Sequence, residues 1–103
     1  MKNIVQFTSK EPPVVELDSA ACAAYVRFSK KKIHRTEIVH SGHVEVTLDI
    51  DASGNPVGIE LIGVKEFTIK ALMAASGLKV PRNRLREMTK ETRYVPTGGL
   101  ATA

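Results

Sequence analysis

The sequence predicts an α+β fold: a four- or five-stranded antiparallel β-meander, a short helix before the Tyr25 strand, and a C-terminal helix packed on the sheet. Strict alternation of apolar and polar residues over Val44–Ile50 is typical of a strand with one buried and one exposed face. Apolar residues at helical spacing follow the strands, from Lys65 to Ser76. Because one sheet alone leaves its apolar face open, we expect that helix to cover it.

The composition indicates one small globular domain. The chain has 103 residues, of which 43% are hydrophobic and 25% charged, close to the usual globular mix. No apolar run approaches the roughly 18 residues of a membrane span, and we expect no signal peptide, because the start of the chain is only modestly hydrophobic. The single cysteine, Cys22, cannot form an internal disulfide, so we expect a reducing, cytoplasmic location.

The first elements are predicted after an N-terminal arm, residues 1–13, which ends in a helix-blocking pair of prolines. Val14–Leu17 is predicted to be a short strand. Asp18 is a favoured helix N-cap type, and the alanine-rich run that follows it predicts one or two helical turns. Alternation and β-favouring side chains then predict a strand over Tyr25–Phe28.

The core domain, residues 14–66, is predicted to contain three further strands, at Ile33–Val39, Val44–Ile50 and Val57–Val64. A tight reversal at Ser41-Gly42 and a loop dense in turn residues after Ile50 separate them. The two-residue period assigns Val57, Ile59 and Leu61 to one face, and Gly58, Glu60 and Ile62 to the other. The expected core consists of Leu17, Val26, Phe28, Val44, Val46, Leu48, Ile50, Ile59, Leu61, Leu72 and Met73.

The C-terminal extension, residues 67–103, is predicted to be helical and basic. Gly77 fits the C-cap of its first helix, and Pro81 fits the first position of a second helix that reaches about Thr92. That second helix has few apolar residues, so we expect it to be too polar to pack deeply. The end of the chain, from Pro96, is expected to be mobile unless another molecule holds it.

The basic charge is concentrated in one part of the extension. Residues 1–78 carry nine Lys/Arg and nine Asp/Glu, so the net charge of +4 comes from residues 79–93. A neutral body with a basic segment favours an acidic partner, either phosphate or protein, although a solvated helix face explains the same charges. The candidate interaction residues are Arg82, Arg84, Arg86, Lys90 and Arg93.

One set of residues resembles the bacterial domain of unknown function 2283 family. The pattern residues are Asp18, Ala21, Tyr25, Arg27, Asp49, Gly54, Gly58 and Glu60. The resemblance implies a compact antiparallel-sheet module over about Val14–Gly63. No activity is established for the family, and some members resemble the partner-binding half of small two-gene toxin and antitoxin systems. The N-terminal arm and the long basic extension depart from the short members.

A calcium site is one hypothesis for the hairpin over residues 49–60. Asp49, Asp51, Ser53, Gly54 and Glu60 nearly match the calcium loop of the EF-hand, in which alternate carboxylates wrap the ion. That loop needs flanking helices, whereas strands are predicted on both sides. A hairpin turn explains the same residues, so we expect no metal site.

The three histidines offer a second metal hypothesis. A two-residue turn at Ser41-Gly42 would set His40 and His43 opposite each other, with His34 or Glu45 as a further zinc ligand. A three-residue turn with Gly42 in the left-handed conformation would shift the pairing and separate the rings. Exposed turn histidines are the simpler interpretation.

Catalysis is not predicted. A dyad of Cys22 with His34 or His43 can be drawn, but nothing in the sequence supports their proximity. Glu60 and Arg27 share a face if their strands adjoin, which suggests a cross-strand ion pair that fixes register or lines a dimer contact; two solvated side chains are the alternative.

The sequence leaves three functions open. The leading one is a non-enzymatic protein-interaction module that needs no cofactor, an antitoxin-like partner-binding protein and plausibly a homodimer through a sheet edge or face. The second is nucleic-acid binding through the basic segment 79–93. Residues 72–88 faintly resemble a helix-turn-helix, but the inner positions Asn83 and Arg86 argue against it. The third is a metal-binding protein or small enzyme at the 49–60 hairpin.

Overall fold

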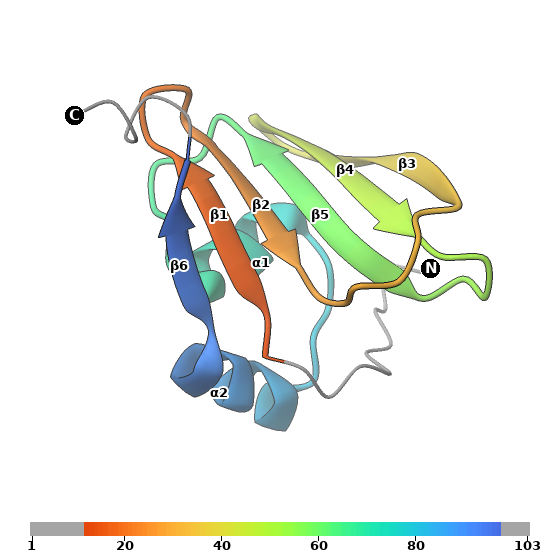
Figure 1. Ribbon diagram of the computed structural model, residues 1–103. Helices are drawn as coiled ribbons and strands as arrows, with labels where there is room; N and C mark the ends of the chain where they lie inside the picture. Colours follow the sequence, from red (N-terminus) through yellow and green to blue (C-terminus); the bar gives the residue numbers. More distant parts are fainter. Residues whose placement is uncertain (1–11, 98–103) are drawn as a thin grey trace.

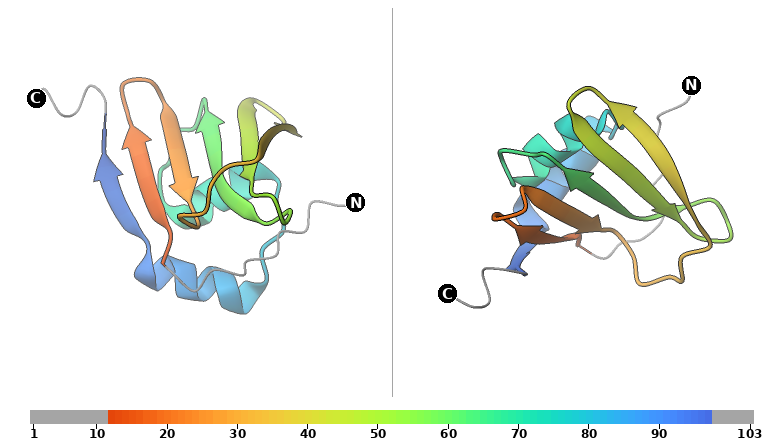
Figure 2. Two further views of the ribbon diagram at one scale, coloured as in Figure 1. Left: turned by 45° about the vertical axis from the view of Figure 1, so that its right-hand side comes forward. Right: turned by 90° about the horizontal axis from the view of Figure 1, so that it is seen from above.

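A computed structural model describes residues 12–97 of the protein (Figure 1). In this part of the chain, one six-stranded sheet has the order β3-β4-β5-β2-β1-β6, and two helices lie on one of its faces (Figure 2). The fold is therefore α+β, as predicted. In chain order the elements are β1 (Val14–Asp18), β2 (Ala23–Arg27), β3 (Arg35–Ser41), β4 (Val44–Ile50), β5 (Pro56–Ile62), α1 (Ile69–Ser76), α2 (Arg82–Glu91) and β6 (Arg93–Pro96).

The predicted alternation along the strands is confirmed. β4 covers the predicted residues, and in β5 the side chains of Val57, Ile59 and Leu61 are buried while Glu60 and Ile62 are exposed. Most neighbouring strands are antiparallel, but β1 and β6 run parallel. One face of the sheet therefore packs against the helices, and we call the other the open face.

The strand order differs from the predicted meander. β3, β4 and β5 follow one another in space, but β2 pairs with β5 and not with β3. The chain crosses from β2 to the far edge through residues 28–34, where the Phe28 N–H donates to the Val57 carbonyl at 2.7 Å. Alternation assigns each side chain to a face but carries no information on which strands are neighbours, which is why the meander was wrong.

The predicted helix between β1 and β2 is also wrong, because these residues form a hairpin turn. Asp18 does cap the segment, since its Oδ1 accepts from the Ala21 N–H at 3.2 Å. The chain then reverses at Cys22, whose φ of 52° lies in the left-handed region. The N-cap hydrogen bond and the alanines that favour a helix are both present. The chain nevertheless makes only one turn there, because β2 then pairs with β1.

The C-terminal extension belongs to the same fold. β6, which was not predicted, joins the edge of β1, and the Arg93 N–H donates to the Pro13 carbonyl at 3.1 Å. The Tyr94 hydroxyl accepts from the Ile69 N–H at 2.9 Å and so ties β6 to the start of α1. Gly77 is the predicted C-cap, with φ 75°. The part of the expected mobile end beyond Thr97 lies outside the described residues.

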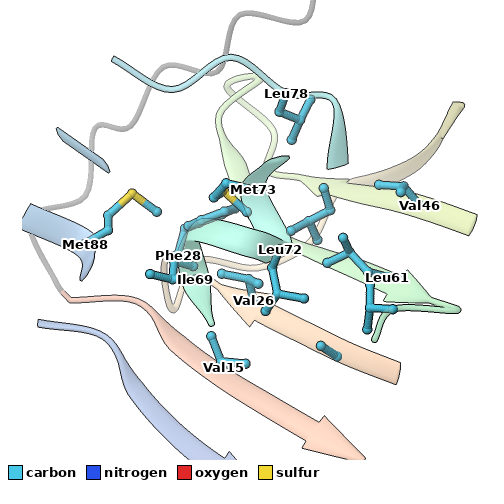
Figure 3. Close-up of a cluster of buried hydrophobic side chains, with 13 residues drawn as sticks. Val15, Val26, Phe28, Val46, Leu61, Ile69, Leu72, Met73, Leu78 and Met88 are labelled. Carbon is cyan, nitrogen blue, oxygen red and sulfur yellow. The ribbon is translucent and has the colours of Figure 1, made fainter. Parts of the chain in front are cut away.

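The core lies between the sheet and the helices (Figure 3). Most expected core residues are buried, whereas Leu17, Val44 and Leu48 are partly buried at its margin. The expectation that α2 is too polar to pack deeply is wrong at Met88, which has 0% exposure and reaches the cluster from α2. Leu85 of the same helix also packs against the cluster, so two apolar side chains anchor an otherwise polar helix. Buried residues outside the expected core include Val15, Ala24, Val57, Val64, Ile69, Leu78 and Met88.

No helix of residues 12–97 is long and apolar enough to cross a membrane.

Replacing Met88 tests whether α2 is part of the cooperative fold. Met88→Ala removes a fully buried side chain and leaves a cavity, so we expect urea denaturation to show a loss of about 2–5 kcal/mol in the free energy of unfolding. Lys90→Ala, on the exposed side of the same helix, is the control and should change stability little. A loss below about 1 kcal/mol for Met88→Ala would contradict the docking of α2.

Candidate functional site

The open face collects most of the family-pattern residues. Tyr25 and Arg27 from β2, Asp49 from β4, and Gly58 and Glu60 from β5 occupy neighbouring positions in the strand register. Tyr25 stands opposite Glu60, and Arg27 stands opposite Gly58, which in turn faces Asp49. Of the remaining pattern residues, Asp18 ends β1 at the start of a reversal, and Ala21 and Gly54 lie in turns. The pattern therefore describes the centre of this face and two of the reversals that shape it.

Tyr25 lies across Gly58 and reaches Asp49. A Cβ added to Gly58 would be 2.1 Å from the Tyr25 hydroxyl oxygen, so only glycine leaves room for the ring. The Tyr25 hydroxyl donates to Asp49 Oδ2 at 2.7 Å, and the Thr36 hydroxyl donates to Asp49 Oδ1 at 2.5 Å. One carboxylate thus links β2, β3 and β4 across the glycine of β5, and it uses both of its oxygens to do so.

The environment of Tyr25 favours its neutral form. Partial burial and the hydrogen bond to Asp49 raise the pKa of the Tyr25 hydroxyl well above its ordinary value. The Arg27 guanidinium lies 5.1 Å from the centre of the Tyr25 ring, a cation–π distance, and opposes this rise. A tyrosine held protonated in this way is a structural hydrogen-bond donor, and it is poorly suited to act as a base near neutral pH.

The expected ion pair between Arg27 and Glu60 is wrong. The two residues do lie on the same face of adjoining strands, but Arg27 contacts Glu16 of β1, with 3.3 Å between the guanidinium nitrogen and the carboxylate oxygen. Glu60 is exposed and stands opposite Tyr25 and Thr47 in the register. The Arg27–Glu16 pair is itself over a third exposed, so its contribution to stability is small.

The loop proposed as a calcium site is a hairpin turn tied by one carboxylate. Asp51 Oδ1 accepts from the N–H groups of Ser53 and Asn55, both at 2.9 Å, and Gly54 has φ 87°. These backbone hydrogen bonds, with that of Asn55 the strongest, hold the pKa of the Asp51 carboxyl below its usual value. Asp49 points to the open face toward Tyr25, so the two aspartates serve different parts of the fold.

His40 and His43 are not opposite each other in the strand register, as a two-residue turn at Ser41-Gly42 would have required. Ser41 pairs with Val44, so the two turn residues are Gly42 and His43, and Gly42 has φ 59°. His40 is opposite Glu45, and His34 precedes the other end of β3. Cys22 and His43 lie in separate turns, and no hydrogen bond joins them in the described residues. Across residues 12–97, no group of three or more His, Cys, Asp or Glu side chains could hold a metal ion.

The five candidate interaction residues of the extension lie in three different environments. Arg82, Arg86 and Lys90 line a surface groove of about 450 Å³, together with Lys70 of α1. Arg84 is turned away and donates to Glu87 at 3.3 Å, with its side chain 21% exposed. Arg93 lies in β6, opposite Val14. Three of the five candidate interaction residues therefore share one site.

Several residues of these sites were missed in the sequence. In the sequence, Lys70 is only one of the charges that cancel over residues 1–78, and no spacing relates it to the residues of α2. Tyr94 was not singled out, although the β-favouring pair Tyr94-Val95 could have indicated β6. The register of the strands, which is a tertiary property, brings Thr36 to Asp49.

Comparison with known proteins identifies a family for the first half of this structure. A family model described as protein of unknown function (DUF2283) matches residues 15–65, which run from β1 to just beyond β5. No curated protein and no solved structure matches the chain. The matched segment includes the open-face residues and ends before the groove.

Replacing Gly58 tests the packing of Tyr25. Gly58→Ala places a methyl group 2.1 Å from the Tyr25 hydroxyl oxygen. Because the ring must then move, we expect a loss of about 1–3 kcal/mol in the free energy of unfolding. In a Tyr25→Ala background the clash is absent, and the same substitution should cost much less. An equal loss in both backgrounds, measured by urea denaturation, would show that the ring does not cover Gly58.

The pKa of Tyr25 gives a pH dependence. In a Tyr94→Phe background, Tyr25 is the remaining tyrosine, and its tyrosinate absorbance should appear above the ordinary value of about 10. Because the folded chain keeps a proton that the unfolded chain loses, stability should fall as the pH rises above that value. Asp49→Asn in the same background should lower the midpoint of the Tyr25 titration, because the hydrogen bond to the carboxylate is lost. A midpoint at the ordinary tyrosine value both with and without Asp49→Asn would contradict this hydrogen bond.

Proposed function

The chain carries a DUF2283 domain over residues 15–65, and we propose that it is a non-enzymatic module that binds an acidic protein partner through the groove between α1 and α2. The observation that carries this proposal is the convergence of four cations, Lys70, Arg82, Arg86 and Lys90, around one groove. In the described residues, none of these four side chains takes part in an ion pair. An acidic ligand would supply the missing counter-charge.

The geometry of α2 concentrates charge of one sign. Arg82, Arg86 and Lys90 are spaced four residues apart, so they form one stripe along the helix. Like charges at this spacing destabilise a helix, and Arg82 also stands in the first turn, where the helix dipole disfavours a cation. Carboxylates of a bound partner would relieve both effects. This cost in the free protein supports a binding role over a merely solvated face.

The floor of the groove favours a protein over a nucleic acid. Leu85 is half-buried between the cations, beside Thr89. An acidic amphipathic helix could place aliphatic side chains on this floor and its carboxylates on the rim. A phosphate backbone has no apolar group for Leu85, and the described lining contains no aromatic side chain on which a base could stack. Nucleic-acid binding, which the exposed arginine stripe also suits, is the second candidate.

The non-enzymatic part of the proposal rests on how the acidic groups are used. Asp49 accepts from two hydroxyl groups and Asp51 from two backbone N–H groups, so both aspartates have structural partners. An antitoxin-like role, which the family resemblance suggests, would then require a partner that is acidic where it docks.

Binding of defined probes tests the proposal. The first probe is a labelled amphipathic peptide with glutamates on one helical face and leucines on the other, and the second is a duplex DNA of similar charge. Fluorescence anisotropy at low salt should show peptide binding that weakens about tenfold or more in Arg82→Glu/Arg86→Glu. Lys30→Glu/Lys32→Glu, with the same charge change on the loop before β3, should bind like the unchanged protein.

Leu85→Ser separates the two candidates. It should weaken binding of the peptide and leave binding of DNA unchanged, because only the peptide has leucines for the floor. Equal weakening by both charge variants would mean that net charge, not the groove, carries the binding. Binding of DNA in preference to the peptide, lost in Arg82→Glu/Arg86→Glu, would replace the protein partner by a nucleic acid.

A further inference from the structure

We infer that the outer edge of β3 pairs with the same edge of a second copy of the chain, antiparallel and with Ile38 on the two-fold axis. β3 is the last strand of the sheet on its side, and within residues 12–97 no strand pairs with its outer edge. This inference concerns a surface other than the groove, because α2 lies away from the β3 edge (Figure 2). It therefore does not depend on the proposed function.

The turn after β3 determines which backbone groups face outward. Gly42 and His43 form a two-residue turn that closes on the pair Ser41–Val44. The closing pair of such a hairpin is hydrogen-bonded, and hydrogen-bonded and non-hydrogen-bonded pairs then alternate along the strands. Ser41 and every second residue before it point their backbone groups toward β4. The outward N–H and C=O groups belong to the residues between them, Thr36, Ile38 and His40.

These outward groups are self-complementary. Ile38 is the middle one of the three residues, so an antiparallel second copy can place its own Ile38 directly opposite. Thr36 then stands opposite His40 of the partner subunit, and the reciprocal pair forms on the other side of the axis. All three outward N–H groups and all three outward C=O groups of each strand gain a partner in this register. The two sheets become one continuous sheet.

The edge carries few of the features that keep sheet edges apart. β3 contains no proline, and its two charged side chains neutralise each other, since Arg35 Nε donates to Glu37 Oε2 at 2.7 Å. Ile38 is 77% exposed on the open face, at the centre of this strand. In the paired arrangement the two Ile38 side chains are adjacent and remove each other from water. An exposed isoleucine on the symmetry axis of an unprotected edge fits a second copy of the same strand.

A disulfide at the axis tests the register. In a Cys22→Ser background, Ile38→Cys puts one thiol on each copy, and hydrogen-bonded antiparallel residues have Cα atoms about 5.5 Å apart, within the disulfide range. Under oxidised glutathione the Ile38→Cys chain should become a covalent dimer. Ile62→Cys, also exposed on the open face but on the inner strand β5, is the control and should stay monomeric. Absence of the Ile38→Cys dimer, or equal cross-linking of the control, overturns the inference.

The oligomeric state gives an independent test without cysteines. Light scattering coupled to size exclusion should show a dimer for the full chain and a monomer for Ile38→Lys, which sets two like charges side by side. Ile62→Lys, the same change at an exposed isoleucine of an inner strand, should remain a dimer. A monomeric unchanged chain at millimolar concentration overturns the inference and leaves the edge to another occupant, such as residues 1–11 or a strand of a different protein. A dimer that survives Ile38→Lys also overturns it.

Discussion

A sheet with one apolar face must have that face covered, and the whole structure of this protein depends on how the chain meets this constraint. The DUF2283 domain ends at residue 65, just after the last of its five strands. The residues that cover its apolar face come later, from α1 and α2, and include Ile69, Leu72 and Met88. In this chain the extension is therefore not an appendage. It supplies five of the thirteen buried residues of the hydrophobic cluster found in residues 12–97, and β6 then extends the sheet beside β1.

The open face is stabilised differently, by polar contacts between strands. Tyr25 bridges β2 to β4 above Gly58, and Asp49 joins it to Thr36 of β3. These contacts cross the sheet at right angles to the strands and would break if any strand slipped by one residue. The family-pattern residues Tyr25, Asp49 and Gly58 therefore have a structural explanation. The two proposed binding surfaces lie elsewhere: the groove at the basic helix α2 in the extension, and the outer edge of β3 within the domain.

Sequence patterns predicted the elements better than their arrangement. Alternation identified β4 and β5 and their buried faces, because burial on one side of a strand imposes a two-residue period that can be read directly. The neighbour of β2 was wrong and β6 was missed, because pairing depends on contacts between distant segments. The prediction of a helix after Asp18 was wrong for a local reason, because a capped turn and a capped helix begin with the same hydrogen bond. The groove could not be predicted from the sequence, because only the tertiary structure brings Lys70 next to α2.

Helices and sheet form one cooperative unit, with the DUF2283 domain as its strand-rich half. Native-state hydrogen exchange measures this directly, since it gives an opening free energy for each amide. The account predicts that the Thr92 N–H, bonded to Met88, and the Arg93 N–H, bonded to Pro13, open with the same free energy as the central amides of β5. Exchange of α2 and β6 by a separate opening of much lower free energy, with β5 still protected, would contradict it.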